Sequence, residues 1–413
     1  MKIVDVRVVV TCPGRNFVLV KIVTDDPGLY GVGDATLNGR ELAVATALEE
    51  HIKPLLLGRD PDRIEDIWQS LFRGAYWRGG PVLMSALSGV DTALWDIKGK
   101  RAGLPVYSLL GGKTREGVLA YSHAGGRDPE EVEDRVRRLM ARGFKVIRAQ
   151  VAIQSPGVTS TYGVGAAERR LTDQMVAASP VRGEGLPEEE IWEPAPYLRA
   201  IPKLFAHLRS TLGDDIELFH DVHERLTPIE AARLARELEP FHLFFLEDPL
   251  RPEHKESFRL LRNHTTIPIA MGELWHNKWE CLPAITEQLI DYIRCDLAHS
   301  GGITEGRKIA AIAEPYQVKT AWHGPGDISP HTHAANVHLD LATTNFGVQE
   351  MVFFSEQQQE VMPGGPTFQD GYLQVRDVSG LGTDLDEAAA ARYPYQRAYL
   401  PTTRRLDGSV QDW

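Results

Sequence analysis

The chain has 413 residues, of which 43% are hydrophobic and 25% charged. That composition is typical of a globular protein, and the length suits two domains or a barrel with a smaller attached domain. A net charge of −12 opposes a nucleic-acid partner, which would require a concentrated basic surface. No apolar run approaches the roughly 20 residues that span a bilayer, so we expect no membrane partner. The three cysteines (Cys12, Cys281 and Cys295) are unclustered and the N-terminus lacks a secretory signal, which favours a cytoplasmic enzyme.

The first third of the sequence predicts strands followed by helices. Alternating or apolar runs indicate strands at residues 6–10 and 17–23, and helical signals follow at 42–57 and 61–72. Five apolar residues are spaced for one buried face of a further helix: Met84, Leu87, Val90, Leu94 and Ile97. That helix should stop before Gly103. We therefore expect an α+β unit over residues 1–115.

From Gly117 the pattern changes to short apolar strands that alternate with amphipathic helical segments. The expected strands lie at residues 118–121, 146–149, 217–219, 244–246, 267–270, 292–294, 317–321 and 347–349. Eight strand–helix units in about 235 residues is the count of a (β/α)₈ barrel. The sequence thus predicts an α/β fold with a barrel over residues 116–364.

One barrel unit carries a long insert, at about residues 151–196. It is rich in Gly, Ser, Pro and Glu and follows a predicted strand. Loops this long in compact domains are usually lids or disordered segments. Because active sites of such barrels lie at the carboxyl ends of the strands, we expect the insert to cover the barrel mouth.

Three carboxylates repeat at the barrel period. Asp221, Glu247 and Glu273 each close an apolar run, and they are spaced 26 residues apart, twice over. Parallel strands in a barrel would bring such side chains together at one mouth, where they would repel each other without a cation. The pattern predicts a divalent metal site with oxygen ligands, although acidic residues also follow strands as helix caps.

Histidines and further acids end neighbouring strands. His223 lies two residues after Asp221 and should share its face if the strand persists that far. His323 ends another run, and Asp296, one barrel unit earlier, could orient its imidazole. Glu350 closes the eighth strand. We expect the histidines to act as general acid or base groups.

An arginine and a tyrosine suggest a second base. Arg148 flanks the second strand, and Tyr162 follows fourteen residues later on the insert. A guanidinium beside a phenol would lower the phenol pKa and make it a plausible base. Packing of Tyr162 within the lid is the alternative.

Several motifs together resemble a known family. The run from Gly89 to Lys100 (GVDTALWDIKGK), the pair Gly111-Gly112 and the Asp–Glu–Glu pattern resemble the enolase superfamily. More specific motifs lie at residues 147–150 (IRAQ), 162–165 (YGVG), 246–248 (LED), 272–273 (GE), 323–324 (HG), 345–350 (NFGVQE) and 407–413. These resemble the mannonate dehydratase family over essentially the whole chain.

The resemblance implies Mg²⁺-assisted dehydration of a sugar acid to a 2-keto-3-deoxy acid. It implies a capping domain at residues 1–115, to which a C-terminal segment, 365–413, returns. It assigns the metal to Asp221, Glu247 and Glu273, proton abstraction to Arg148 with Tyr162, and protonation of the leaving hydroxyl to His223. It places around the substrate Asn38, His123, Arg294, His323, Asp327, Glu350 and Trp413. The resemblance to enzymes with a His–Asp dyad also suggests His323, beside Asp296, as a second base.

One departure concerns the substrate. Pro325 follows His323-Gly324 where the efficient mannonate dehydratases have Ala, and Pro-bearing members turn mannonate over poorly or not at all, some preferring gluconate. We therefore expect low or shifted activity. The alternatives are an epimerase that uses Tyr162 and His323 on opposite faces, and a divergent metal-binding protein without turnover. We also expect a homo-oligomer.

Overall fold

A computed structural model describes residues 1–160, 187 and 189–412. Its N-terminal part is a three-stranded antiparallel sheet in the order β1 (Ile3–Thr11), β2 (Phe17–Thr24) and β3 (Tyr30–Asp34). The helices that follow are α1 (Glu41–Thr46), α2 (Lys53–Leu56), α3 (Ile64–Gly74), α4 (Pro81–Ala102) and α5 (Val106–Leu109). A π-helical turn, η1 (Ala47–Ile52), joins α1 to α2, so the helix predicted at 42–57 is confirmed with a wider turn inside it.

Helix α4 lies directly on β3. A Cβ atom at Gly33 would collide with the carbonyl oxygen of Gly89, and one at Gly31 with that of Ala93. Glycine at these two strand positions therefore allows the helix and strand backbones to touch. The helix ends at Gly103, whose φ of 66° is left-handed, as the sequence predicted.

The two faces of the N-terminal sheet are covered by different parts of the chain. Val18, Val20 and Ile22 of β2 pack with the N-terminal helices, whereas Phe17 and Leu19 point to the other face. That second face is covered by Val361, Met362, Leu385, Ala389 and Ala390, all from the last part of the chain. The C-terminal segment thus completes the capping domain, as expected.

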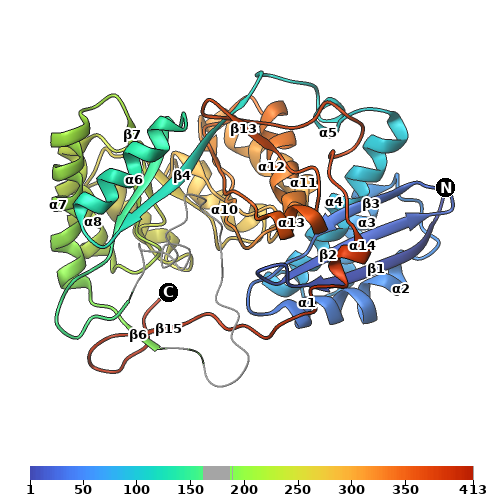
Figure 1. Cartoon of the computed structure of the whole chain (residues 1–413), viewed down its shortest axis with the longest axis horizontal. Coiled ribbons are helices and arrows are strands. Elements are labelled where there is room, and N and C mark those ends of the chain that lie inside the picture. The colour runs from blue at the N-terminus through green and yellow to red at the C-terminus, as the bar shows by residue number, and fades with distance from the viewer. Residues whose placement is uncertain (161–186, 188, 413) are drawn as a thin grey trace.

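Within the described residues, eight parallel strands form the predicted barrel. They are β4 (Val118–Gly126), β5 (Val146–Val151), β7 (Glu217–Asp221), β8 (Leu246–Glu247), β9 (Ile269–Met271), β10 (Tyr292–Ile293), β11 (Lys319–Thr320) and β12 (Gln349–Glu350). The ring closes because β12 pairs with β4 and Thr320 bridges to Phe346 just before β12. The barrel and the capping domain lie side by side (Figure 1).

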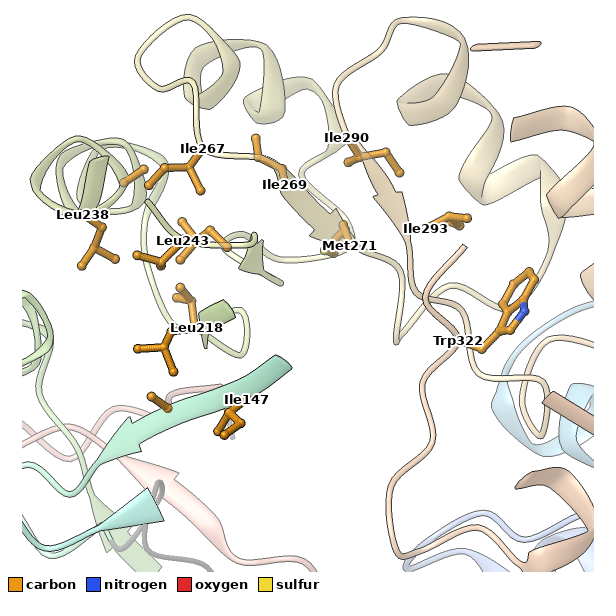
Figure 2. Packing of buried hydrophobic residues seen from close by; sticks show 14 of the residues in the cluster. Ile147, Leu218, Leu238, Leu243, Ile267, Ile269, Met271, Ile290, Ile293 and Trp322 are labelled. Carbon is orange, nitrogen blue, oxygen red and sulfur yellow. The ribbon is translucent and has the colours of Figure 1, made fainter. Parts of the chain in front are cut away.

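Helices surround the barrel. Helix α13 (Glu356–Val361), which follows β12, packs instead on the capping-domain sheet through Val361. The barrel helices are α6 (Pro129–Ala141), α7 (Pro194–Leu212), α8 (Pro228–Leu238), α9 (Phe258–Arg262), α10 (Lys278–Thr286), α11 (Gly302–Ala313) and α12 (Pro330–Ala342), with short 3₁₀ turns η3 (Glu239–Phe241), η4 (Lys255–Ser257) and η5 (Glu314–Tyr316). The outward side chains of the strands form the main core with these helices. Figure 2 shows part of it, including Ile147, Leu218, Ile269, Ile293 and Trp322.

The C-terminal segment visits both domains. A hairpin of β13 (Thr367–Gln369) and β14 (Tyr372–Gln374) adds to β4, and α14 (Glu387–Ala390) lies beside β1. The chain then crosses back, and β15 (Thr402–Arg404) pairs with β6 (Glu189–Ile191) at the end of the insert (Figure 1). The boundaries at residues 115 and 364 stay predictions. No helix in the described part of the chain is long and apolar enough to cross a membrane.

Candidate active site at the barrel mouth

The interior of the barrel is filled by one layer of side chains, with one residue at each strand. In the described structure the layer consists of Tyr121, Val146, Phe219, Phe245, Ala270, Tyr292, Ala321 and Val348. Residues two positions further along a strand face the same way, so the next inward positions form a second layer at the mouth. That second layer is His123, Arg148, Asp221, Glu247, Gly272, Arg294, His323 and Glu350. Seven of its eight positions are residues that the sequence analysis singled out, and the eighth, Gly272, precedes Glu273.

The backbone turns at Gly272, just after strand β9, so the side chain that points into the mouth comes one residue later than on the other strands. Gly272 has a φ of 137°, a backbone conformation that residues other than glycine rarely adopt. A Cβ there would lie 3.2 Å from the backbone nitrogen of Arg294. The chain therefore turns at Gly272 and presents Glu273 instead, whose Oε2 lies 3.5 Å from His323 Nε2.

Three buried carboxylates cluster at the mouth. Asp221, Glu247 and Asp248 each place an oxygen within 4.8 Å of the others. Burial raises the pKa of Glu247 well above its ordinary value, and Asp221 adds to this while Arg294 opposes it. Burial, followed by the charge of Glu273, likewise raises the pKa of Asp248. Each acid thus makes ionisation of the others less favourable.

This donor set fits a hard divalent cation. In the described structure Glu247 Oε2 and Asp248 Oδ2 are buried without a hydrogen-bond partner, and carboxylate oxygens are the ligands that Mg²⁺ selects. The tight group contains Asp248, whereas the predicted third ligand, Glu273, lies next to it and nearer His323. Asp248 Oδ1 already accepts a hydrogen bond from the Gly272 N–H, at 3.2 Å. The sequence analysis did not single out Asp248, although it stands in the LED motif.

Arginine side chains border the acids. Arg148 Nη1 lies 2.9 Å from Asp221 Oδ2 and 3.9 Å from Glu247 Oε1. Arg294, which is fully buried, places Nη2 2.6 Å from Glu247 Oε1 and donates to Glu350 at 3.2 Å. These two guanidinium groups therefore lie against the carboxylates of Asp221, Glu247 and Glu350 and oppose the repulsion among them.

Glu350 contacts polar groups that lie at the ends of three other strands. His123 Nε2 lies 2.7 Å from its Oε1, and the Gly324 N–H donates to its Oε2 at 2.9 Å. Burial opposes ionisation of Glu350, but His323, His123 and Arg294 prevail and lower its pKa well below the ordinary value. Glu350 is therefore an ionised acceptor that unites predicted substrate-binding residues.

Tyr121 belongs to the interior layer, but its hydroxyl reaches the mouth layer, a contact that the sequence analysis missed. Its hydroxyl accepts a hydrogen bond from Arg294 Nη1 at 2.6 Å. Burial raises its pKa well above the ordinary value of 10, so the phenol stays neutral. As part of an apolar strand it carried no signal that set it apart from core residues.

His223 reaches the mouth by a turn and not along a strand. Strand β7 ends at Asp221, and His223 and Glu224 have left-handed φ values of 58° and 56°. The condition on which Asp221 and His223 would share a strand face, that the strand persists to residue 223, is therefore not met. The His223 N–H donates to Asp221 Oδ1 at 2.8 Å, and its Nε2 lies 4.0 Å from Glu273 Oε1. Such strained residues cluster at functional sites.

His323 pairs with Asp296 as the spacing suggested. Its Nδ1 lies 2.8 Å from Asp296 Oδ2, so Nε2 points toward Glu273 and Glu350. Burial would lower the histidine pKa, but Glu273, Glu350 and Asp296 raise it to about 10.

The capping domain contributes one predicted substrate contact. Asn38, which follows β3, donates to Asp327 Oδ2 at 2.9 Å across 289 residues of sequence. The buried Arg15 places Nη1 4.0 Å from Asp327 Oδ1. Pro325, on the same loop as Asp327, accepts at its carbonyl a hydrogen bond from His333 Nε2 at 3.1 Å. Tyr162 and Trp413 lie outside the described residues, so their predicted roles stay predictions.

Comparisons with known proteins agree with this architecture. Residues 131–389 match the family described as enolase C-terminal domain-like, and residues 6–111 match the N-terminal domain of mandelate racemase and muconate lactonizing enzyme. The chain belongs to the enolase superfamily. It is 52% identical over 413 residues to a D-mannonate dehydratase of Caulobacter sp. strain K31, with all of each chain covered.

Other relatives carry different names. A D-galactonate dehydratase family member, RspA, of Cellvibrio japonicus is 50% identical with all of each chain covered. A crystal structure of an enolase from Pantoea ananatis contains bound D-gluconate and Mg. Its sequence is 47% identical to this chain, and the two structures superpose with a TM-score of 0.91 over 100% of this chain and 99% of that one. This superfamily member is thus an enzyme whose relatives are named as dehydratases, which are lyases.

Proposed function

We propose that the chain catalyses the Mg²⁺-dependent dehydration of a sugar acid, of the mannonate or gluconate type, to a 2-keto-3-deoxy acid. The observation that carries this proposal is the cluster of buried acids at the mouth, bordered by Arg148, His223 and His323. A relative named D-mannonate dehydratase and a neighbour with bound D-gluconate and Mg support the substrate class.

Asp221, Glu247 and Glu273 would hold the metal. Asp248 would restrain the backbone before Glu273, because its Oδ1 accepts a hydrogen bond from the Gly272 N–H. When bound, Mg²⁺ would stabilise the two negative charges that arise when a proton is removed next to a carboxylate. The protein residues then perform the proton transfers. Arg148 with Tyr162 would remove the proton at C2, and His223 would protonate the departing hydroxyl at C3 from its Nε2.

The remaining predicted residues would bind and orient the acid. Arg294, His123 and Glu350 form one connected set in the barrel, and Asn38 with Asp327 forms another beside the capping domain. Trp413 would add a further contact. His323, held at Nδ1 by Asp296, directs its Nε2 toward Glu273 and Glu350, where it can exchange a hydrogen bond or a proton with the substrate.

A substrate screen tests the proposal. Mannonate, gluconate and galactonate should be incubated with the protein and Mg²⁺, and keto-acid formation measured. We expect turnover of at least one acid, and we expect removal of Mg²⁺ by a chelator to abolish it. Exchange of the C2 hydrogen with solvent deuterium without keto acid would favour the epimerase, and absence of both reactions would favour the non-catalytic alternative.

Pro325 should limit the activity on mannonate. Proline fixes φ near −65° and has no N–H donor, and the loop that it shapes carries Asp327. Misplacement of a substrate contact by 1 Å can cost about a hundredfold in rate. We therefore expect slow mannonate turnover, and Pro325→Ala should raise it by up to about a hundredfold. Fast mannonate turnover by the unaltered protein would refute this part.

We also propose that the protein is a homo-oligomer, and light scattering would measure its oligomeric state.

A further inference from the structure

The loop after β10 brings a second histidine to the aspartate of the His323 pair. Asp296 is fully buried, and its Oδ2 accepts the hydrogen bond from His323 Nδ1 at 2.8 Å. The same oxygen lies 3.9 Å from His299 Nε2. The other oxygen, Oδ1, accepts from the Ala298 N–H at 2.7 Å. Asp296 is therefore held between two imidazoles and a backbone amide.

Ser85 of helix α4 determines which nitrogen of His299 carries the proton. Its hydroxyl lies 2.9 Å from His299 Nδ1. A lone pair on Nε2 would face the Asp296 carboxylate and be repelled, so the favourable tautomer has its proton on Nε2. Nδ1 then accepts a hydrogen bond from the Ser85 hydroxyl. The result is a chain of contacts from the capping domain through His299 and Asp296 to His323.

The backbone of His299 is fixed independently of its side chain. Its N–H donates to the Asp296 carbonyl at 3.0 Å, and its carbonyl accepts from the ring of His276. Glu280 Oε2 in turn accepts from the His276 N–H at 2.9 Å. Loss of the His299 imidazole should therefore leave the loop in place and change only the support of Asp296.

We propose that His299 is a positioning residue for the Asp296–His323 pair, and that Ser85 sets its tautomer. Without the Nε2–H of His299, the Asp296 carboxylate loses one of the groups that keep Oδ2 directed at His323 Nδ1. The His323 ring is then less restrained, and its Nε2 samples positions away from Glu273 and Glu350. The capping domain thereby helps to orient an imidazole of the barrel through His299 and Asp296.

Kinetics of three variants test this inference. His299→Gln and Ser85→Ala should each lower kcat by about tenfold or more, the cost typical of losing the support of a functional histidine, and leave KM within about twofold. Ser88→Ala is the matched control. Ser88 lies one turn further along α4, and its hydroxyl accepts from the Gly301 N–H at 2.8 Å but touches neither histidine. A merely structural role of these serines predicts an equal or larger effect for Ser88→Ala, and that result would overturn the proposal.

A spectroscopic measurement does not depend on turnover. The Nδ1–H resonance of His323 can be followed by NMR in protein labelled with ¹⁵N-histidine and assigned by its loss in His323→Asn. It should shift or broaden in His299→Gln and Ser85→Ala but not in Ser88→Ala. An unchanged resonance in folded His299→Gln would overturn the inference. The inference rests on the proposed function only for its kinetic test, so if no acid is turned over, the proposed function fails and the resonance alone decides.

Discussion

In the barrel, seven of the eight described strands place a candidate functional side chain two residues after the residue that fills the interior, whereas on the capping side the contacts join segments far apart in the sequence. Asp221 and Glu247 reach the mouth because Phe219 and Phe245 are packed below them. Asn38 reaches Asp327 only because two domains are packed together, and the same is true of Ser85 and His299.

The difference teaches how each half can fail. A change on the barrel side acts within one strand, since strand parity fixes the direction of the side chain locally. A change on the capping side acts through the interface of the domains, where small shifts are transmitted by packed groups. Variants on the barrel side should therefore lower mainly kcat, whereas variants on the capping side should raise mainly KM.

The largest effect should come from Glu247→Gln. Loss of the central carboxylate removes a proposed Mg²⁺ ligand, and metal catalysis worth several kcal/mol corresponds to about a thousandfold in rate. The unaltered protein should gain about 2.7 kcal/mol in its free energy of unfolding at Mg²⁺ concentrations of 100 Kd, and the variant should gain much less. Calorimetric titration with Mg²⁺ measures the affinity, and thermal unfolding with Mg²⁺ measures the gain in stability. An unchanged Mg²⁺ affinity in the variant would contradict the assignment of Glu247 as a ligand.

Two further variants distinguish the third ligand. Glu273→Gln should weaken Mg²⁺ binding more than Asp248→Asn, because Asp248 Oδ1 is already committed to the Gly272 N–H. The reverse order would assign the metal to the tight cluster of Asp221, Glu247 and Asp248.

Gly272→Ala should have the next largest effect. The new methyl group would press on strand β10, and a left-handed φ in a residue other than glycine costs about 1–3 kcal/mol of stability. Displacement of Glu273 should lower kcat by about a hundredfold. Gly58→Ala is the control, since Gly58 has a φ of 81° but nothing within 4 Å of a Cβ. If both variants lose the same activity, the turn at Gly272 is not what places Glu273.

On the capping side, Asn38→Ala should act more weakly. Its hydrogen bond to the Asp327 carboxylate is worth about 1.5–3 kcal/mol, which corresponds to a rise in KM of about tenfold or more. The effect on kcat should be smaller, because the proposed metal ligands and proton-transfer groups are unchanged. Arg40→Ala, an adjacent exposed side chain bonded only to the Gly39 carbonyl among the described residues, should leave steady-state kinetics unchanged. Equal KM values for the two variants would contradict a role for Asn38.

Asp91→Asn should change only the pH dependence of stability. Asp91 Oδ2 on α4 accepts from the Thr304 N–H at 2.9 Å, and burial raises the Asp91 pKa from 3.8 to about 7. Between these values the folded protein keeps a proton that the unfolded chain releases, so stability falls as pH rises through this window. An asparagine cannot ionise. The variant should therefore gain stability relative to the unaltered protein between pH 4 and 8, by at most about 4 kcal/mol.

Urea unfolding at several pH values measures this gain. A difference between the two proteins that stays constant with pH would mean that Asp91 does not hold a proton in the folded state.

Much of the barrel could be predicted from the sequence because its information is local. Short apolar runs locate the strands, and residues that directly end such runs, among them Asp221, Glu247 and Glu350, can be read from the sequence as candidates for the mouth. The position of Glu273 could be predicted from its spacing, but the reason could not, since the left-handed turn at Gly272 is a property of the folded backbone.

Contacts that depend on tertiary packing carried no such signal. The sequence does not indicate that Tyr121 meets Arg294, because a tyrosine in an apolar strand looks like core. Nor does it pair Ser85 with His299, which are separated by 214 residues. The helix at residues 61–72 was predicted three residues too early, because Asp60 accepts from the Asp62 N–H and forms a turn before Ile64.

The left-handed residues at the ends of β7 and β8 bear on protein engineering. His223, Glu224 and Asp248 each have a positive φ, and Glu224 is also a buried acid among other acids. Backbone conformation and electrostatics therefore both favour glycine or asparagine at Glu224. A laboratory selection for heat tolerance alone would drift toward such replacements at the rim of the barrel. Because Glu224 shares its left-handed turn with His223, a selection of this kind should measure turnover as well as heat tolerance.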